Sequence, residues 1–414
     1  MLMSKRSLPQ TYVEDEDEAQ TLIVTLRDAT LGVTLELAYT IYRDRPVITR
    51  SARLINHSEQ AVDLEKVASM QMDLPTQPLD AISLPGSYAR ERQLSRERLH
   101  RGVTQFESRR GASSHHMNPF VALADPNTNE FQGNVLGALL IYSGNHQVSL
   151  ERDPIGQTRL TMGINEYNFD WRLAAGDSFQ TPEVAMVYST TGLNGMSQTY
   201  HDLLRDRVAR SGGGGRFDAG LIYYMPQSWP SDNNDPIERL KIQYGTSLVY
   251  PISAITAHVG TSPDELLGRS TSMKMRGAVA MSGTLGYELD AAQLSDADKQ
   301  AVIRQVAFYK QHRELVQYGT FYRLESPFES NTVAWMFVSP DQKEALLFTF
   351  VILGAVQPEP HITKLAGLDP QQTYVETDTN KMYGGDELMQ LGLYTTPVQT
   401  SDFTAQVHYF KAKD

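Results

Sequence analysis

Short runs of alternating apolar and polar residues fill the chain from about residue 20 to residue 205. Val33, Leu35, Leu37, Tyr39 and Ile41 occupy every second position, which places one face of a β-strand against a core. Many short strands separated by turns predict a β-sandwich for this region. The turn signals include Leu84-Pro85-Gly86, Ser143-Gly144-Asn145 and Ala175-Gly176-Asp177.

A second region of β character runs from residue 319 to residue 414. Val333, Trp335 and Phe337 alternate with other residues, a turn follows at Ser339-Pro340-Asp341, and the apolar run EALLFTFVI then returns. This pattern predicts a second, smaller β-sandwich.

Three helices carry recognisable end signals. The stretch SQTYHDLLRDRVAR is helical, and Ser197 is its expected N-cap. Asp235 is the expected N-cap of the next helix, with Pro236 at its first position and Gly245 at its end. The third helix is expected from Ser295 to Tyr318, with an apolar stripe of Val302, Ile303 and Val306 and a stop at Gly319.

The middle of the chain is too short for a closed eight-fold barrel. We expect domains at residues 1–210, 211–318 and 319–414, and the middle one offers a strand-like run, LIYYM, followed by helices. A closed eight-fold barrel needs about 200–250 residues. The middle domain therefore holds one strand–helix unit with extra helices rather than a closed barrel, and the fold class is mainly β.

The composition limits the partners. The formal net charge of -12 argues against nucleic acid and against an anionic membrane surface, because both attract basic patches. The chain has no cysteine, so disulfides and thiolate metal sites are excluded. No long apolar run and no signal-like start is visible, so we expect a cytoplasmic protein that does not enter a membrane.

The segment SWPSDNND carries the main catalytic candidate. Asp235 is explained by its role as a helix cap, whereas Asp232 has no such explanation and follows an apolar run. Trp229 beside a carboxylate suits a sugar, because the ring stacks on C–H faces while the acid protonates a glycosidic oxygen. From the residues alone, a catalytic aspartate and a turn aspartate both remain open.

Other motifs give weaker signals. The run SGGGG is either a flexible linker or a loop that lets backbone approach a ligand, and no Gly-Lys-Ser/Thr follows it to make a phosphate loop. His115 and His116 are adjacent, so on a strand they would point to opposite faces and would not share a metal. No G-x-S-x-G elbow occurs, which argues against a serine hydrolase.

Several stretches together resemble the α-galactosidases of glycoside hydrolase family 36, in particular the large bacterial type. They are LPGSYARER (84–92), ESRRGASSHHMNPF (107–120), YSGN (142–145), MGIN (162–165), FDWRLAAGDSFQTPEV (169–184), GLNGMSQTYHDL (192–203), SGGGGRFD (211–218), MPQSWPSDNNDPIERLKIQYGTS (225–247) and YGGDEL (383–388). The resemblance covers nearly the whole chain. It implies an N-terminal supersandwich, a remnant of a (β/α)8 barrel and a C-terminal β-sandwich.

The resemblance also implies a function and roles for individual residues. Asp232 matches the general acid/base, Trp229 the neighbouring aromatic, and Gly213 a backbone contact in the galactose subsite. The implied reaction is retaining cleavage of terminal α-galactosides such as melibiose and raffinose, without metal or cofactor. The implied partners are a small α-galactoside and further copies of the same chain.

The sequence departs from the family pattern in the barrel. No Lys-Trp-Asp stretch, which would carry the nucleophile, occurs anywhere, and Arg210 replaces a cysteine before the glycine run. We also expect a shortened N-terminus. A retaining mechanism needs a second carboxylate about 5–5.5 Å from the first, so we expect this chain alone to be inactive or impaired. A non-catalytic carbohydrate-binding or assembly protein, and complementation by a second polypeptide, are the competing hypotheses.

Overall fold

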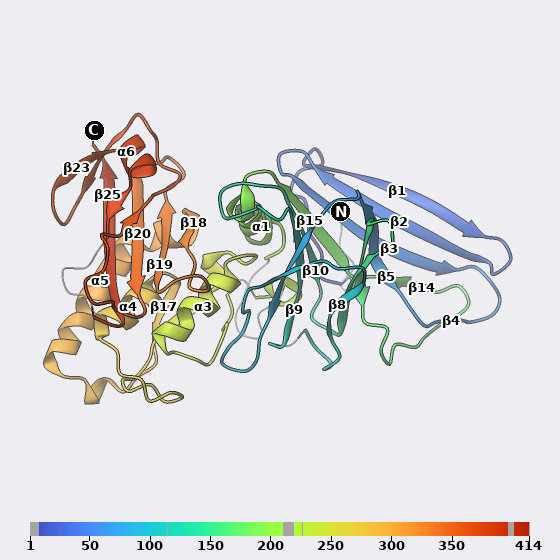
Figure 1. Cartoon of the computed structure of the whole chain (residues 1–414). Coiled ribbons are helices and arrows are strands. Elements are labelled where there is room, and N and C mark those ends of the chain that lie inside the picture. The colour runs from blue at the N-terminus through green and yellow to red at the C-terminus, as the bar shows by residue number, and fades with distance from the viewer. Residues whose placement is uncertain (1–7, 114, 210–218, 226, 396–400, 414) are drawn as a thin grey trace. The chain divides into compact units, whose positions relative to one another are not determined.

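The computed structural model describes residues 8–113, 115–209, 219–225, 227–395 and 401–413. The chain divides into two compact units, Met1–Ser228 and Trp229–Asp414, and each is described by itself. The first unit is built mainly from antiparallel sheets, and the second combines an antiparallel sheet with helices (Figure 1). The chain as a whole is mainly β, as predicted. None of the helices in the described ranges is both long and apolar enough to span a membrane.

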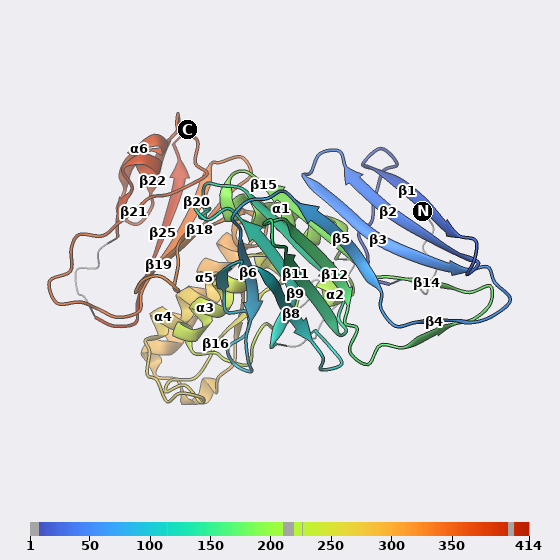
Figure 2. The same cartoon turned by 45° about the vertical axis from the view of Figure 1, so that its right-hand side comes forward.

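The first unit is a two-layer sandwich. One sheet contains, in spatial order, β1 (Ala19–Asp28), β2 (Val33–Tyr42), β3 (Val47–Asn56), β15 (Glu183–Ser189), β10 (Val135–Ile141), β9 (Met117–Ala124), β6 (Asp80–Pro85) and β7 (Ser95–Arg98), with β14 (Ser178–Gln180) beside β3. The other contains β5 (Ala68–Leu74), β12 (Thr158–Ile164), β11 (His146–Arg152) and β8 (Gly102–Ser108), as Figure 2 shows. A small sheet pairs β13 (Trp171–Leu173) with β4 (Val62–Leu64).

The core of this sandwich lies between β5–β12–β11–β8 and the β15, β10, β9 and β6 part of the large sheet. Val121, Leu140, Leu150 and Met162 are among its fully buried side chains. The β1–β3 part of the large sheet contributes nothing to this core, and Ile41 is 57% exposed. The alternation in β2 therefore predicted the strand correctly, but the expectation that its apolar face meets a core was wrong.

Helix α1 (Gly192–Arg207) packs on the outer face of the same sheet. The Tyr200 hydroxyl donates to the Ala185 carbonyl at 3.0 Å, and a Cβ at Gly137 would lie 2.7 Å from the Tyr200 ring. The helix begins five residues before Ser197, which is buried inside it, so the predicted N-cap was wrong. Backbone N–H groups of its first turn donate to carbonyls in the loop 129–133 instead of to a capping side chain.

The expected strand LIYYM is absent. Its first residues belong to a short helix, α2 (Ala219–Ile222), and a turn follows. A short apolar run has too few residues for its periodicity to distinguish a strand from a helix. In the described part of the chain, the run LIYYM pairs with no strand.

The second unit opens with a small α/β segment. It contains α3 (Pro236–Thr246), the 3-10 helix η1 (Ile252–Ala254), β16 (Thr256–Val259), α4 (Met273–Met281), β17 (Thr284–Tyr287), the 3-10 helix η2 (Ala291–Gln293) and α5 (Asp296–Tyr318). Strands β16 and β17 are parallel and are joined through α4, which is a βαβ connection. Asp235 caps α3 and Ser295 caps α5 as predicted, although α3 continues one residue past Gly245 and Ile303 is 59% exposed.

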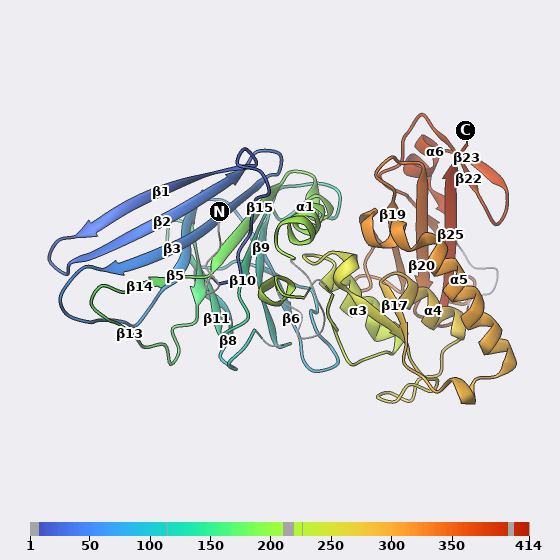
Figure 3. The same ribbon diagram turned by 180° about the vertical axis from the view of Figure 1, so that it is seen from behind.

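The rest of the second unit is a six-stranded sheet. Its order is β18 (Thr320–Glu325), β19 (Thr332–Val338), β20 (Glu344–Val351), β25 (Thr404–Ala412), β22 (Thr373–Glu376) and β23 (Lys381–Gly384). One face is covered by α6 (Gly385–Gln390) and by the two-stranded sheet of β21 (Ile362–Thr363) and β24 (Leu393–Tyr394). Helices α4 and α5 contact β25, β20 and β19 of this sheet (Figure 3).

A buried arginine joins the α/β segment to this sheet. Arg323 of β18 has no exposed surface, and its Nη1 donates to the Ser247 carbonyl at the end of α3 at 2.9 Å. Its guanidinium also lies 5.6 Å from the ring centre of Tyr244, which belongs to α3. These contacts fix α3 against the C-terminal sheet.

Candidate active site at the ends of β16 and β17

The two parallel strands bring polar side chains to one edge. The carboxyl ends of parallel strands meet at the same edge of a sheet, which is where barrel enzymes carry their reacting groups. His258 lies near the end of β16, and Glu288 follows the end of β17. The Glu288 N–H donates to the Val259 carbonyl at 3.0 Å, and this hydrogen bond joins the ends of the two strands.

Trp229 and Asp232 form a hydrogen-bonded pair in the segment before α3. The indole Nε1–H of Trp229 donates to Asp232 Oδ1 at 2.8 Å, and the Asp232 side chain is exposed. The sequence predicted that these residues act together, and the structure brings them into contact.

His258 connects this pair to Glu288. The rings of Trp229 and His258 are 4.2 Å apart, centre to centre, at an interplanar angle of 73°. Nδ1 of His258 lies 3.6 Å from Oε2 of Glu288, and Asn234 Nδ2 donates to the same oxygen at 2.7 Å. Burial lowers the pKa of His258, although the Glu288 carboxylate acts in the opposite direction. The neutral imidazole is therefore favoured here.

The absence of a side chain at Gly286 leaves space for the His258 ring. A Cβ at Gly286, the residue paired with His258 on β17, would lie 2.5 Å from the imidazole ring. The ring therefore lies directly over the neighbouring strand and against Trp229. Neither His258 nor Glu288 was predicted from the sequence as a site residue; a polar residue at the end of each short parallel strand is the signal that marks them.

Asp235 has a structural role. Its carboxylate accepts hydrogen bonds from the N–H groups of Ile237 and Glu238 at 3.1 and 3.0 Å, and it also pairs with Arg269. The side chain is completely buried, and this burial raises its pKa although the N–H groups and Arg269 oppose the shift. Asp235 holds the start of α3, which in turn positions the segment that carries Asp232.

Two sequence-predicted positions fall elsewhere. Gly213 lies outside the described residues. His115 and His116 lie in a turn rather than on a strand, and their ring centres are 4.6 Å apart, so the expectation of opposite faces was wrong. Within the described ranges, no three histidine, aspartate or glutamate side chains come together in a way that could hold a metal ion.

Asp232 and Trp229 are the sequence-predicted candidates at this edge. The Asp232 carboxyl is exposed, and the Trp229 indole lies beside it as an aromatic surface. Glu288 is a second carboxylate at this edge, but its side chain is 56% exposed and bonded to Asn234. A nucleophilic carboxylate has to face the anomeric carbon directly.

Three family models match most of the chain. The glycosyl hydrolase family 36 N-terminal domain matches residues 2–174, the melibiase model matches residues 178–211 and 209–319, and the family 36 C-terminal domain matches residues 332–410. The melibiase match is split at residues 209–211, where the sequence predicts a missing part of the barrel.

A named relative aligns with nearly the whole chain and has additional residues. "Alpha-galactosidase 1" of Pediococcus pentosaceus is 38% identical over 610 aligned positions, which cover 98% of this chain and 83% of the relative. Since this chain has only 414 residues, about 200 of those positions have no counterpart in it.

Two solved structures of α-galactosidase AgaA variants from Geobacillus stearothermophilus match with a TM-score of 0.96. One is a complex with 1-deoxygalactonojirimycin and the other a complex with raffinose; each is 35% identical and covers 98% of this chain and 85% of the solved chain. With these relatives and with family models matching most of its length, the chain belongs to glycoside hydrolase family 36.

Proposed function

We propose that the chain is an α-galactosidase-type glycoside hydrolase that retains the acid/base and has lost the nucleophile. The observation that carries this proposal is the 2.8 Å contact between the Trp229 indole and the exposed Asp232 at the edge of β16–β17. The α-galactosidase names of the relatives, and the raffinose bound to one of them, support a terminal α-galactoside as ligand. Trp229 and the backbone at Gly213 would contact the sugar.

The chemistry follows from the two-carboxylate mechanism. Protonated Asp232 donates its proton to the glycosidic oxygen as the bond to the anomeric carbon breaks, while a second carboxylate forms the glycosyl intermediate. Water, deprotonated by Asp232, would then release the sugar with retained configuration. Without a nucleophile the first bond at the anomeric carbon does not form, so a whole step is lost.

Hydrolysis of an aryl α-galactoside tests the proposal. We expect the intact 46.3 kDa chain and its Asp232→Asn variant to show the same background rate. Turnover that disappears in Asp232→Asn would contradict the loss of the nucleophile. Comparison with Glu288→Gln would then decide whether Glu288 supplies that group.

A second polypeptide that supplies the missing barrel strands is a further candidate. Within the described residues, β16 and β17 pair only with each other, so the outer edge of each strand is open to another strand. We expect co-expression with a barrel fragment of a family 36 relative to restore hydrolysis. Restored activity must disappear in Asp232→Asn; activity that survives this substitution would show that the fragment works without this chain.

A non-catalytic carbohydrate-binding role is favoured by a separate observation, a cavity in the C-terminal sheet that is described below.

We also propose that the chain associates with further copies of itself and acts in the cytoplasm. The chain has no cysteine and so needs no disulfide, which allows a reducing compartment. Exposed apolar side chains on β1–β3 support self-association.

A further inference from the structure

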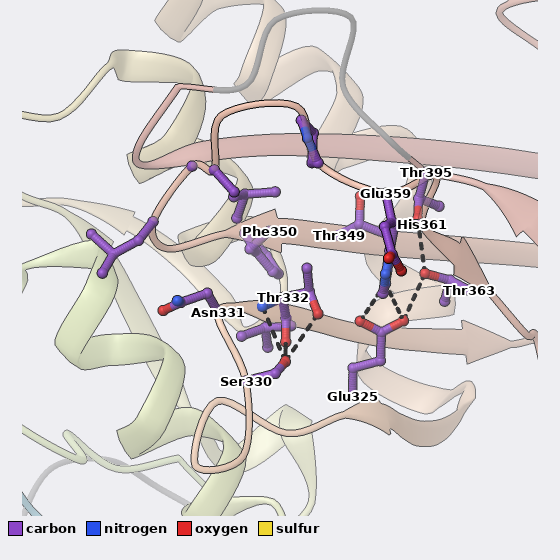
Figure 4. Close-up of a pocket in the computed structure, with 16 residues that line it drawn as sticks. Glu325, Ser330, Asn331, Thr332, Thr349, Phe350, Glu359, His361, Thr363 and Thr395 are labelled. Carbon is purple, nitrogen blue, oxygen red and sulfur yellow. Dashed lines mark hydrogen bonds and ion pairs between the residues drawn. The ribbon is translucent and has the colours of Figure 1, made fainter.

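A cavity of about 280 Å³ lies at one end of the C-terminal sheet. Its walls come from the ends of β18, β19 and β20, and residues of the segment 353–361, which precedes β21, complete the lining (Figure 4). The volume is close to the lower end of the range for small-molecule sites, about 300–1,000 Å³. A water molecule takes up only about 30 Å³, so the cavity has room for a ligand much larger than solvent.

One side of the cavity is a fixed carboxylate. Nε2 of His361 lies 2.9 Å from both oxygens of Glu325, and the Thr363 hydroxyl donates to Oε1 at 2.8 Å. Thr363 is held in turn by Thr395 at 2.9 Å, as Figure 4 shows. An ionised carboxylate accepts about four hydrogen bonds, and the Glu325 side chain is 20% exposed. It therefore keeps acceptor capacity toward the cavity.

The remaining lining combines hydroxyl groups with apolar walls. Ser330, Asn331 and Thr332 supply hydroxyl and amide groups at the start of β19, and Thr349 adds a nearly buried hydroxyl. The apolar lining residues are Val333, Phe350, Val351, Leu353 and Pro358. Such a lining of apolar surface with a few fixed polar groups is typical of sites for small organic ligands.

The charges exclude several ligand classes. The lining residues, all of them in the described part of the chain, include two glutamates and one histidine but no lysine or arginine. A phosphate or carboxylate ligand would therefore meet no strong counter-charge. In the described ranges no cluster suited to a metal ion occurs either.

We propose that this space, the Glu325 cavity, binds a neutral polyhydroxylated molecule of monosaccharide size. Hydroxyl groups of the ligand donate to Glu325 and exchange hydrogen bonds with Ser330 and Thr332, while its C–H faces contact Val351 and Leu353. The inference rests on the carbohydrate-binding alternative of the proposed function, and on no property of Asp232.

Calorimetry on the full chain with galactose and with glucose tests the proposal. We expect saturable binding of at least one hexose, at least ten-fold weaker binding in Glu325→Gln, and loss of binding in Val351→Phe, which fills the cavity without removing a hydrogen bond. Glu151→Gln, at an exposed position of β11 in the first unit, is the matched control and should bind as the unchanged chain does; Asp232→Asn is measured beside it. Thermal melting of each variant shows whether it is folded.

Each of the following results would contradict the proposal. Absence of hexose binding up to tens of millimolar would exclude a sugar site, and binding lost only in Asp232→Asn would place the sugar at the other site. Saturation by tetramethylammonium but not by hexoses would assign the Glu325 cavity to cations. Because no readout depends on hydrolysis, failure of the proposed catalytic function leaves this experiment unchanged.

Discussion

His146 lies completely buried at the start of β11 in the N-terminal sandwich. Burial lowers its pKa to about 4 from an ordinary value of 6.5. Between these pH values the unfolded chain binds a proton that the folded chain does not bind. The free energy of unfolding therefore falls as the pH decreases through this window.

We expect His146 to account for about 3 kcal/mol of lost stability between pH 6.5 and pH 4, since one pKa unit corresponds to about 1.4 kcal/mol. Urea unfolding of the unchanged chain and of His146→Gln across this range measures the effect. The difference between the two proteins should shrink as the pH falls. Parallel stability curves would show that His146 is not the group responsible.

At this scale the sequence names only some of the side chains that meet at the edge of β16 and β17. Asp232 and Trp229, the candidates named from the sequence, belong to a motif only a few residues long, and their side chains form a hydrogen bond. His258 and Glu288 were missed because they are 30 residues apart and meet only when β16 and β17 pair in parallel. The close contact between Gly286 and His258 could not be predicted from the sequence either, because it forms only in the folded chain and no neighbouring residue indicates it.

Helix α3 depends on a single buried cap. Replacing Asp235 with alanine removes the acceptor for two N–H groups and leaves Arg269 without its partner, so we expect a loss of about 2–4 kcal/mol. Asp235→Asn keeps a capping oxygen and should cost less. The matched control is Ser295→Ala at the exposed cap of α5, for which about 1 kcal/mol is expected. Urea unfolding measures all three, and equal losses at the two caps would contradict the role of burial.

The caps also show which elements a sequence can predict. Asp235 and Ser295 were found because a side chain bonds to N–H groups two or three residues ahead. The start of α1 was misplaced because its N–H groups bond to carbonyls of the loop 129–133, about 60 residues earlier. The run LIYYM was read as a strand, whereas it forms the end of a short helix and a turn, because so short an apolar run has no periodicity that separates strand from helix.

For the whole molecule, the β1–β3 face is the largest departure from the predicted packing. Leu22, Val24 and Leu26 of β1 share a face with Ile41 and Ile48 of the next two strands, and they are 63%, 36%, 51%, 57% and 40% exposed. Exposed apolar surface of this kind favours association. Sequence periodicity identified these strands but contains no information on whether a second layer covers them.

We expect the chain to self-associate through the β1–β3 face. Light scattering should give a mass above 46.3 kDa for the unchanged chain and a lower mass for the double variant Leu22→Lys, Leu26→Lys. Ile303→Lys on α5 is the control, because Ile303 is similarly exposed at 59% on a different element. A monomeric unchanged chain, or equal masses for all three proteins, would contradict this role of the face.

The anchoring of α3 by Arg323 has a consequence for any partner of the second unit. The contacts of Arg323 with Ser247 and Tyr244 attach α3 to the C-terminal sheet inside the second unit. We therefore expect α3 to stay in place without further strands. A fragment arriving at β16 or β17 would meet a preorganised surface, so the entropy cost of assembly would fall on the fragment alone.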